Sequence, residues 1–147
     1  MDCSAGPPRN SVLVVEDNPV NSRFIQLLLE RLGCGQVRVV TNGQEALDVV
    51  RTGYAPALVL MDCQMPVMDG YEATRQIRHW QQTQREAGKT CPPIAIVALT
   101  AAAFDAERDA CLAAGMDDFL TKPVVIAALK EVLAHWLPSA ATPASPN

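Results

Sequence analysis

Residues 58–70 read LVLMDCQMPVMDG, and the fold prediction starts from this stretch. Its first four residues are apolar without alternation, which is typical of a strand covered on both faces. The run then ends on Asp62 and continues into a loop rich in Met and Pro. A buried strand that ends on a carboxylate predicts a functional edge at the carboxyl ends of a parallel sheet.

Short apolar runs of this kind recur along the chain and alternate with segments of helical spacing. Strands are predicted at 12–15, 37–40, 58–61, 94–99 and 119–120. Helices are predicted at about 19–32, 43–52, 70–82, 103–114 and 124–137. Five such βα units predict an α/β, flavodoxin-like doubly wound (βα)5 fold, with a five-stranded parallel sheet in the order 2-1-3-4-5.

Two helices carry clear sequence signals. Asn18 before Pro19 predicts a capping residue followed by the first helical position. Apolar residues then recur every four positions, and the last helix has a stripe of its own. The two sets are Val20, Phe24, Leu28 and Leu32, and Val125, Leu129, Val132 and Trp136. Residues 82–93 are predicted to form a polar loop, residues 1–10 and 138–147 to be disordered, and residues 11–137 to form one domain.

Composition and charge bound the possible functions. The chain has 147 residues, of which 49% are hydrophobic and 19% charged, as expected for one globular domain. A net charge of -4 argues against direct binding to nucleic acid or to a membrane surface. The five cysteines form no CxxC pair, and we expect reduced thiols rather than a zinc site. No signal peptide or membrane-length apolar run is found, which predicts a cytoplasmic protein.

Polar residues gather where the predicted strands end. Glu16 and Asp17 follow the first strand, Asp62 ends the third, Thr100 follows the fourth and Lys122 follows the fifth. In the order 2-1-3-4-5 the first and third strands are neighbours, so three carboxylates meet at one edge. Their mutual repulsion predicts a bound cation, and hard oxygen ligands suit Mg²⁺. The same acids would repel the phosphate of FMN, which argues against a flavin site.

Each of these residues alone has a plain structural explanation. Asp17 could cap a helix, Thr100 could end a strand, and Lys122 could be a surface ammonium. Phe119 could be an ordinary core residue. Convergence of the polar residues on one edge of the sheet favours a functional site.

Four motifs carry a resemblance to a known family. They are VLVVEDN (12–18), LVLMDCQMPVMDGYEATRQIR (58–78), IVALTA (96–101) and GMDDFLTKP (115–123). In this order they resemble the CheY-like receiver domain of response regulators in two-component phosphorelays, over about residues 11–137. The wording around Asp62 and Lys122 is most similar to receivers of hybrid sensor histidine kinases.

The resemblance implies a role for each residue at the strand ends. Asp62 would accept a phosphoryl group from the phosphohistidine of a histidine kinase or a histidine phosphotransfer protein. Glu16, Asp17, Asp62 and the backbone carbonyl of Gln64 would hold Mg²⁺. Thr100 and Lys122 would contact the phosphoryl oxygens.

A switch is also implied. Thr100 would move toward the phosphoryl group, and Phe119 would rotate into the space behind it, which changes the face of the fourth helix, fifth strand and fifth helix. Many family members carry Tyr at this position, and its hydroxyl group can hydrogen-bond in one state. Phe119 cannot, so the coupling between the phosphoryl group and this face is expected to be weaker or purely steric. Pro123 implies a cis peptide bond with Lys122 that directs the ammonium inward.

Two other functions remain open at this stage. A phosphatase of the haloacid dehalogenase type also uses Asp and Mg²⁺, but Asp62-Cys63-Gln64 lacks the second acid of its DxD loop. An interaction module that never becomes phosphorylated is the other alternative. For the receiver we expect no classical enzyme, only Mg²⁺-dependent self-phosphorylation and autodephosphorylation at Asp62. Dimerisation on phosphorylation is left open.

Overall fold

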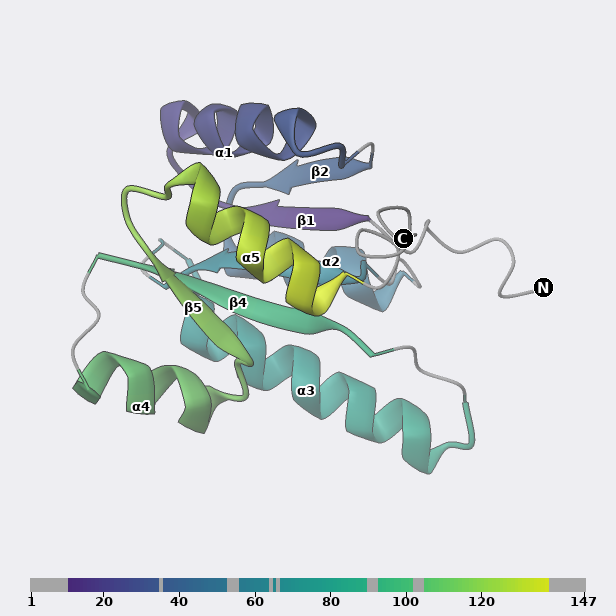
Figure 1. Ribbon diagram of the computed structural model, residues 1–147. Coiled ribbons are helices and arrows are strands. Elements are labelled where there is room, and N and C mark those ends of the chain that lie inside the picture. The colour runs from purple at the N-terminus through teal and green to yellow at the C-terminus, as the bar shows by residue number, and fades with distance from the viewer. Residues whose placement is uncertain are drawn as a thin grey trace.

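The structure, a computed structural model, describes residues 11–34, 36–52, 56–63, 65, 67–89, 93–101 and 105–137. Within these residues, five strands alternate with five helices (Figure 1). The strands are β1 (Val12–Val15), β2 (Val37–Val40), β3 (Leu58–Asp62), β4 (Ala95–Thr100) and β5 (Asp118–Thr121). The helices are α1 (Pro19–Arg31), α2 (Gly43–Arg51), α3 (Gly70–Glu86), α4 (Asp105–Ala114) and α5 (Ile126–Trp136).

The strands form one parallel sheet in the order β2-β1-β3-β4-β5, which confirms the predicted topology. Val15 pairs with Met61, and Asp62 pairs with Leu99. This register brings the carboxyl ends of β1, β3 and β4 to the same edge of the sheet.

Helices cover both faces of the sheet. Figure 1 shows α1 and α5 on one face, and α3 and α4 on the other. One core cluster joins the sheet to α1 and α5, and the other joins it to α2, α3 and α4. All side chains of β1, β3 and β4 are buried, as the unbroken apolar runs predict. Among the described residues, no helix combines the length and apolar character needed to cross a membrane.

Helix α1 begins as predicted, and of its predicted apolar stripe Leu28 and Leu32 pack against the core. The Asn18 side chain accepts hydrogen bonds from the backbone N–H groups of Val20, at 2.9 Å, and Asn21, at 3.3 Å. However, Val20 and Phe24 are 74% and 46% exposed. The buried residues are Ser22, Ile25 and Leu29. A strict four-residue repeat drifts by about 40° per step around an α-helix, so it cannot follow one face.

The bounds of α3 and α5 also differ from the sequence prediction. Helix α3 continues to Glu86, because residues 71–86 contain no Gly or Pro and are rich in helix-forming Gln, Arg and Glu. The helix ends before Gly88, whose φ of +80° favours glycine. At α5, Val125 is the capping residue and is 57% exposed, whereas Leu129 and Val132 are buried as predicted. The loop predicted at 82–93 is therefore wrong over residues 82–86, which are helical, and its residues 90–92 lie outside the described residues.

Candidate functional site

Three carboxylates meet at the carboxyl ends of β1 and β3. Glu16 follows β1 and is buried, the neighbouring Asp17 is exposed, and Asp62 is the last, buried residue of β3. One oxygen from each lies within 4.8 Å of the others. This acidic cluster (Glu16, Asp17 and Asp62) confirms that the topology brings these residues together.

The ammonium group of Lys122 lies against the acidic cluster. Its Nζ is 3.2 Å from Glu16 Oε1 and 3.1 Å from Asp62 Oδ1. The backbone N–H of Lys122 donates to the carbonyl of Thr100 over 2.8 Å, which fixes the chain after β5 beside the end of β4. The peptide bond between Lys122 and Pro123 is cis, as the sequence predicts.

The charges of the site perturb one another. Burial raises the pKa of Glu16, and repulsion from Asp62 adds to this, while a hydrogen bond from the Asn18 N–H and the charge of Lys122 oppose it. Burial works to lower the pKa of Lys122, but its hydrogen bond to Asp62 and the charges of Asp62 and Glu16 outweigh burial, so this pKa is raised. The site therefore disfavours the ionised carboxyl of Glu16 and favours a cation.

The donor set of the acidic cluster fits a divalent cation. Glu16 Oε1 is buried and forms no hydrogen bond with any described residue, although Lys122 lies at ion-pair distance. One ammonium cannot neutralise three carboxylates, and hard oxygen donors are the ligands of Mg²⁺ and Ca²⁺. The cluster is thus a candidate cation site. Gln64, whose carbonyl was predicted as a further ligand, lies outside the described residues.

The first residue of α3, Gly70, lies tightly against the end of β3. The N–H of Gly70 donates to the carbonyl of Cys63 over 3.1 Å, and a Cβ at Gly70 would collide with the carbonyl of Asp62. Val67, between β3 and α3, has a φ of +72° and is 82% exposed. A positive φ is strained for a β-branched residue, and such strain is typical of functional loops.

Thr100 and Phe119 occupy different places. Thr100 is the buried last residue of β4, at the edge that holds Asp62. Phe119 pairs with Ala98, two residues before that edge, and packs partly buried on the core beneath α3 and α4. Phe119 is therefore outside the acidic cluster, on the path between Thr100 and α4.

One contact could not be read from the sequence. Arg108 of α4 places its Cζ atom 5.1 Å from the centroid of the Phe119 ring. A surface pocket of about 240 Å³ lies here, between α4 and β5. No motif or spacing marks Arg108, because its partner is eleven residues away on another element.

Comparisons with known proteins agree with this geometry. Residues 12–134 match the family model described as the response regulator receiver domain. The chain is 44% identical over 133 residues to the sensor histidine kinase GacS of Pseudomonas protegens, and the matched region covers 90% of this chain. The match spans only 14% of the length of that kinase.

Solved receiver structures are also similar. One is the receiver domain of a sensor histidine kinase of Pseudomonas aeruginosa with magnesium in its active site cleft, at 40% identity and a TM-score of 0.73, covering 86% of this chain and 96% of that one. A second is a chain from the co-crystal structure of the Saccharomyces cerevisiae phosphotransfer protein Ypd1 with the receiver domain of Ssk1. It is 34% identical, with a TM-score of 0.78, covering 86% of this chain and 88% of that one.

Proposed function

This chain belongs to the response regulator receiver domain family, and from that premise we propose that Asp62 is its phosphoacceptor. The observation that carries the proposal is the ion pair between buried Asp62 and partly buried Lys122, beside the acidic cluster at the carboxyl edge of the sheet. A carboxylate held beside a cation is a competent nucleophile for phosphoryl transfer.

The transfer exchanges one bond to phosphorus for another. A carboxylate oxygen of Asp62 forms a bond to phosphorus as the bond from phosphorus to the histidine nitrogen breaks, and the imidazole leaves with that electron pair. Lys122 then neutralises phosphoryl oxygens in place of carboxylate charge, and the Thr100 hydroxyl donates a hydrogen bond to one of them. Mg²⁺ held by Glu16, Asp17 and Asp62 would supply further positive charge to the transferred group.

Phosphorylation then changes the conformation of Thr100 and Phe119. Movement of Thr100 toward the phosphoryl group opens space beside Ala98, the residue paired with Phe119. Rotation of the ring into that space alters the surface formed by α4, β5 and α5. A two-state aromatic side chain of this kind converts a local charge change into a surface change.

The proposed donor is a histidine kinase or a histidine phosphotransfer protein. The relatives support this, since GacS is a sensor histidine kinase and Ssk1 was crystallised with the phosphotransfer protein Ypd1. Because the chain spans a small part of the kinases it matches, the activity of any larger protein is part of the proposal. A cytoplasmic location stays a prediction from the sequence.

Intact-mass measurement after incubation with Mg²⁺ and a small acyl phosphate tests the proposal. We expect one phosphoryl adduct on the wild type, and none on Asp62→Asn or in the presence of EDTA. Asp109→Asn, which changes an exposed aspartate on α4, is the matched control and should keep the adduct. Absence of an adduct on the wild type, together with no binding of beryllofluoride, would favour an interaction module that is never phosphorylated.

A further inference from the structure

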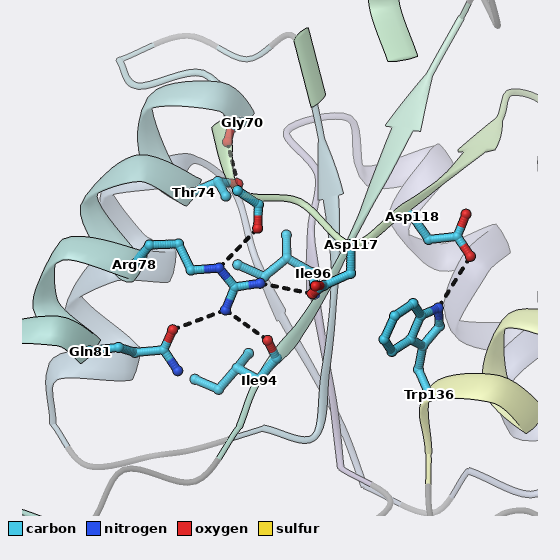
Figure 2. Close-up of polar contacts among 10 residues, drawn as sticks. Gly70, Thr74, Arg78, Gln81, Ile94, Ile96, Asp117, Asp118 and Trp136 are labelled. Carbon is cyan, nitrogen blue, oxygen red and sulfur yellow. Dashed lines mark hydrogen bonds and ion pairs between the residues drawn. The ribbon is translucent and has the colours of Figure 1, made fainter. Parts of the chain in front are cut away.

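The backbone before Phe119 is tied firmly to its neighbours. Figure 2 shows Arg78 of α3 reaching Asp117, the residue before β5. Arg78 Nη2 donates to Asp117 Oδ2 over 2.8 Å, and the backbone N–H of Ile96 in β4 donates to the same oxygen over 2.8 Å. The start of β5 is therefore joined to α3 and β4 by side-chain hydrogen bonds.

The next residue ties β5 to α5. Asp118 Oδ2 accepts a hydrogen bond from the indole Nε1 of Trp136, at 3.2 Å (Figure 2). Asp118 Oδ1 accepts one from the backbone N–H of Phe119 itself, at 2.8 Å. With its backbone held in this way, Phe119 can respond to the site chiefly by turning its side chain.

The ring of Phe119 is held on one side by α4. The guanidinium of Arg108 lies over it, with Cζ 5.1 Å from the ring centroid, and both residues line the pocket between α4 and β5. Within the described part of the chain, Arg108 forms no ion pair with a carboxylate. The ring is therefore the partner that the structure gives to this charge.

We propose that Arg108 is a positioning residue that holds the Phe119 ring, through this cation–π contact, in the orientation that the structure shows, called outward below. The inference rests on the proposed function, since it concerns regulation of the site at Asp62. Inward rotation of the ring breaks the contact, so the outward state carries a favourable interaction that the inward state lacks. Because Phe119 has no hydroxyl group that could hydrogen-bond in one state, this contact is what favours one orientation of the ring. Its loss removes one interaction between α4 and β5.

The orientation of the ring can be measured without any phosphoryl donor. Nuclear Overhauser effects from the Phe119 ring to the Leu112 methyl groups report the outward state, and those to the Thr100 methyl group report the inward state. Arg108→Gln should raise the inward-to-outward ratio by about two- to fivefold, the range for a cation–π contact at an exposed site. Arg108→Lys keeps a cation and should restore most of the wild-type ratio.

The matched control is Arg75→Gln, on the exposed surface of α3, where the arginine pairs with Glu72. It should leave the ring ratio unchanged. A wild-type ratio in Arg108→Gln, or equal effects of Gln and Lys at this position, overturns the inference. As a second readout, Arg108→Gln should be phosphorylated by acyl phosphate about two- to fivefold faster than wild type. Failure of the wild type to form an adduct would count against the proposed function alone, because the ring ratio is measured separately.

Discussion

Each end of β4 holds a partly buried cation beside acidic side chains, but the two ends balance the charges differently. Near the start of the strand lies the Arg78 network, formed by Arg78, Gln81, Ile94, Ile96, Gly115 and Asp117 (Figure 2). All three guanidinium nitrogens of Arg78 donate, over 2.8 to 2.9 Å, to two backbone carbonyls, one amide and one carboxylate. At the other end, one ammonium faces three carboxylates, and a buried oxygen of Glu16 has no hydrogen bond to a described residue.

The difference separates stability from function. In the Arg78 network, one cation meets one carboxylate and its remaining donors meet neutral acceptors, so burial costs little and the contacts join α3, β4 and β5. In the acidic cluster, burial and like charge raise the pKa of Glu16, which is a cost to the folded protein. A site that must bind a cation and a phosphoryl group carries this cost as part of its function.

The largest effect should come from removing the cation at the carboxyl end of β4, beside the acidic cluster, which we call the functional end. The quantity affected is the rate of phosphorylation. Lys122→Met takes away the ammonium beside Glu16 Oε1 and Asp62 Oδ1. We expect the rate of phosphorylation by acyl phosphate to fall by about 10² to 10³, as when one oxyanion-stabilising donor is lost. Initial rates from intact mass, at saturating Mg²⁺, measure this.

Lys89→Met is the control for loss of a lysine, because Lys89 is exposed in the turn after α3. It should leave the rate within twofold of wild type, about the scatter for a surface change. A fall of less than tenfold in the phosphorylation rate of Lys122→Met would contradict the role of Lys122 in phosphoryl transfer.

At the start of β4, which we call the structural end, removal of the cation of the Arg78 network should affect stability instead. Arg78→Met leaves Asp117 and the carbonyls of Ile94 and Gly115 without their shared donor. Because both ion-pair partners are about one-third exposed, we expect a loss of about 2–3 kcal/mol in the free energy of unfolding, below the value for a fully buried pair. Urea denaturation measures the loss.

The neighbouring arginine supplies the contrast. Arg75→Met removes an exposed pair with Glu72 three residues away, worth about 0.3–0.5 kcal/mol. Equal losses in the two variants would contradict the structural role given to the Arg78 network. So would a strong decrease in the phosphorylation rate of folded Arg78→Met.

The functional end was predictable from the sequence, whereas the structural end was not. Glu16, Asp17, Asp62, Thr100 and Lys122 each end or follow an apolar strand, and the strand order alone brings such positions to one edge. The roles given to these residues, and to Gln64, remain predictions.

Long-range polar contacts leave no local pattern. Arg78 forms hydrogen bonds with Gly115 and Asp117, which are 37 and 39 residues away, and nothing in the sequence of α3 indicates this. Helical periodicity also gave only part of the buried face of α1. Leu28 and Leu32 pack against the core, whereas Val20 is exposed. The burial of a residue depends on what packs against its helix, which a repeat of apolar residues does not specify.

The smallest expected effect is an increase in stability. Glu16→Gln removes the buried charge whose pKa is raised chiefly by burial, and the new amide oxygen can still accept from the Asn18 N–H. In EDTA we expect the free energy of unfolding to rise by about 1 kcal/mol, within the range for relief of a costly functional residue. Thermal unfolding in EDTA measures this rise, and the same measurement with Mg²⁺ gives the stabilisation by the cation.

The exposed member of the acidic cluster makes this comparison decisive. Asp17→Asn removes a proposed ligand from solvent rather than from the interior, so it should leave stability in EDTA unchanged. Both variants should lose most of the Mg²⁺-dependent stabilisation of the wild type, which follows from mass action on the folded state. If Glu16→Gln were less stable than the wild type in EDTA, the pairing of Glu16 with Lys122 would outweigh burial. The acidic cluster would then be a stabilising network like that of Arg78.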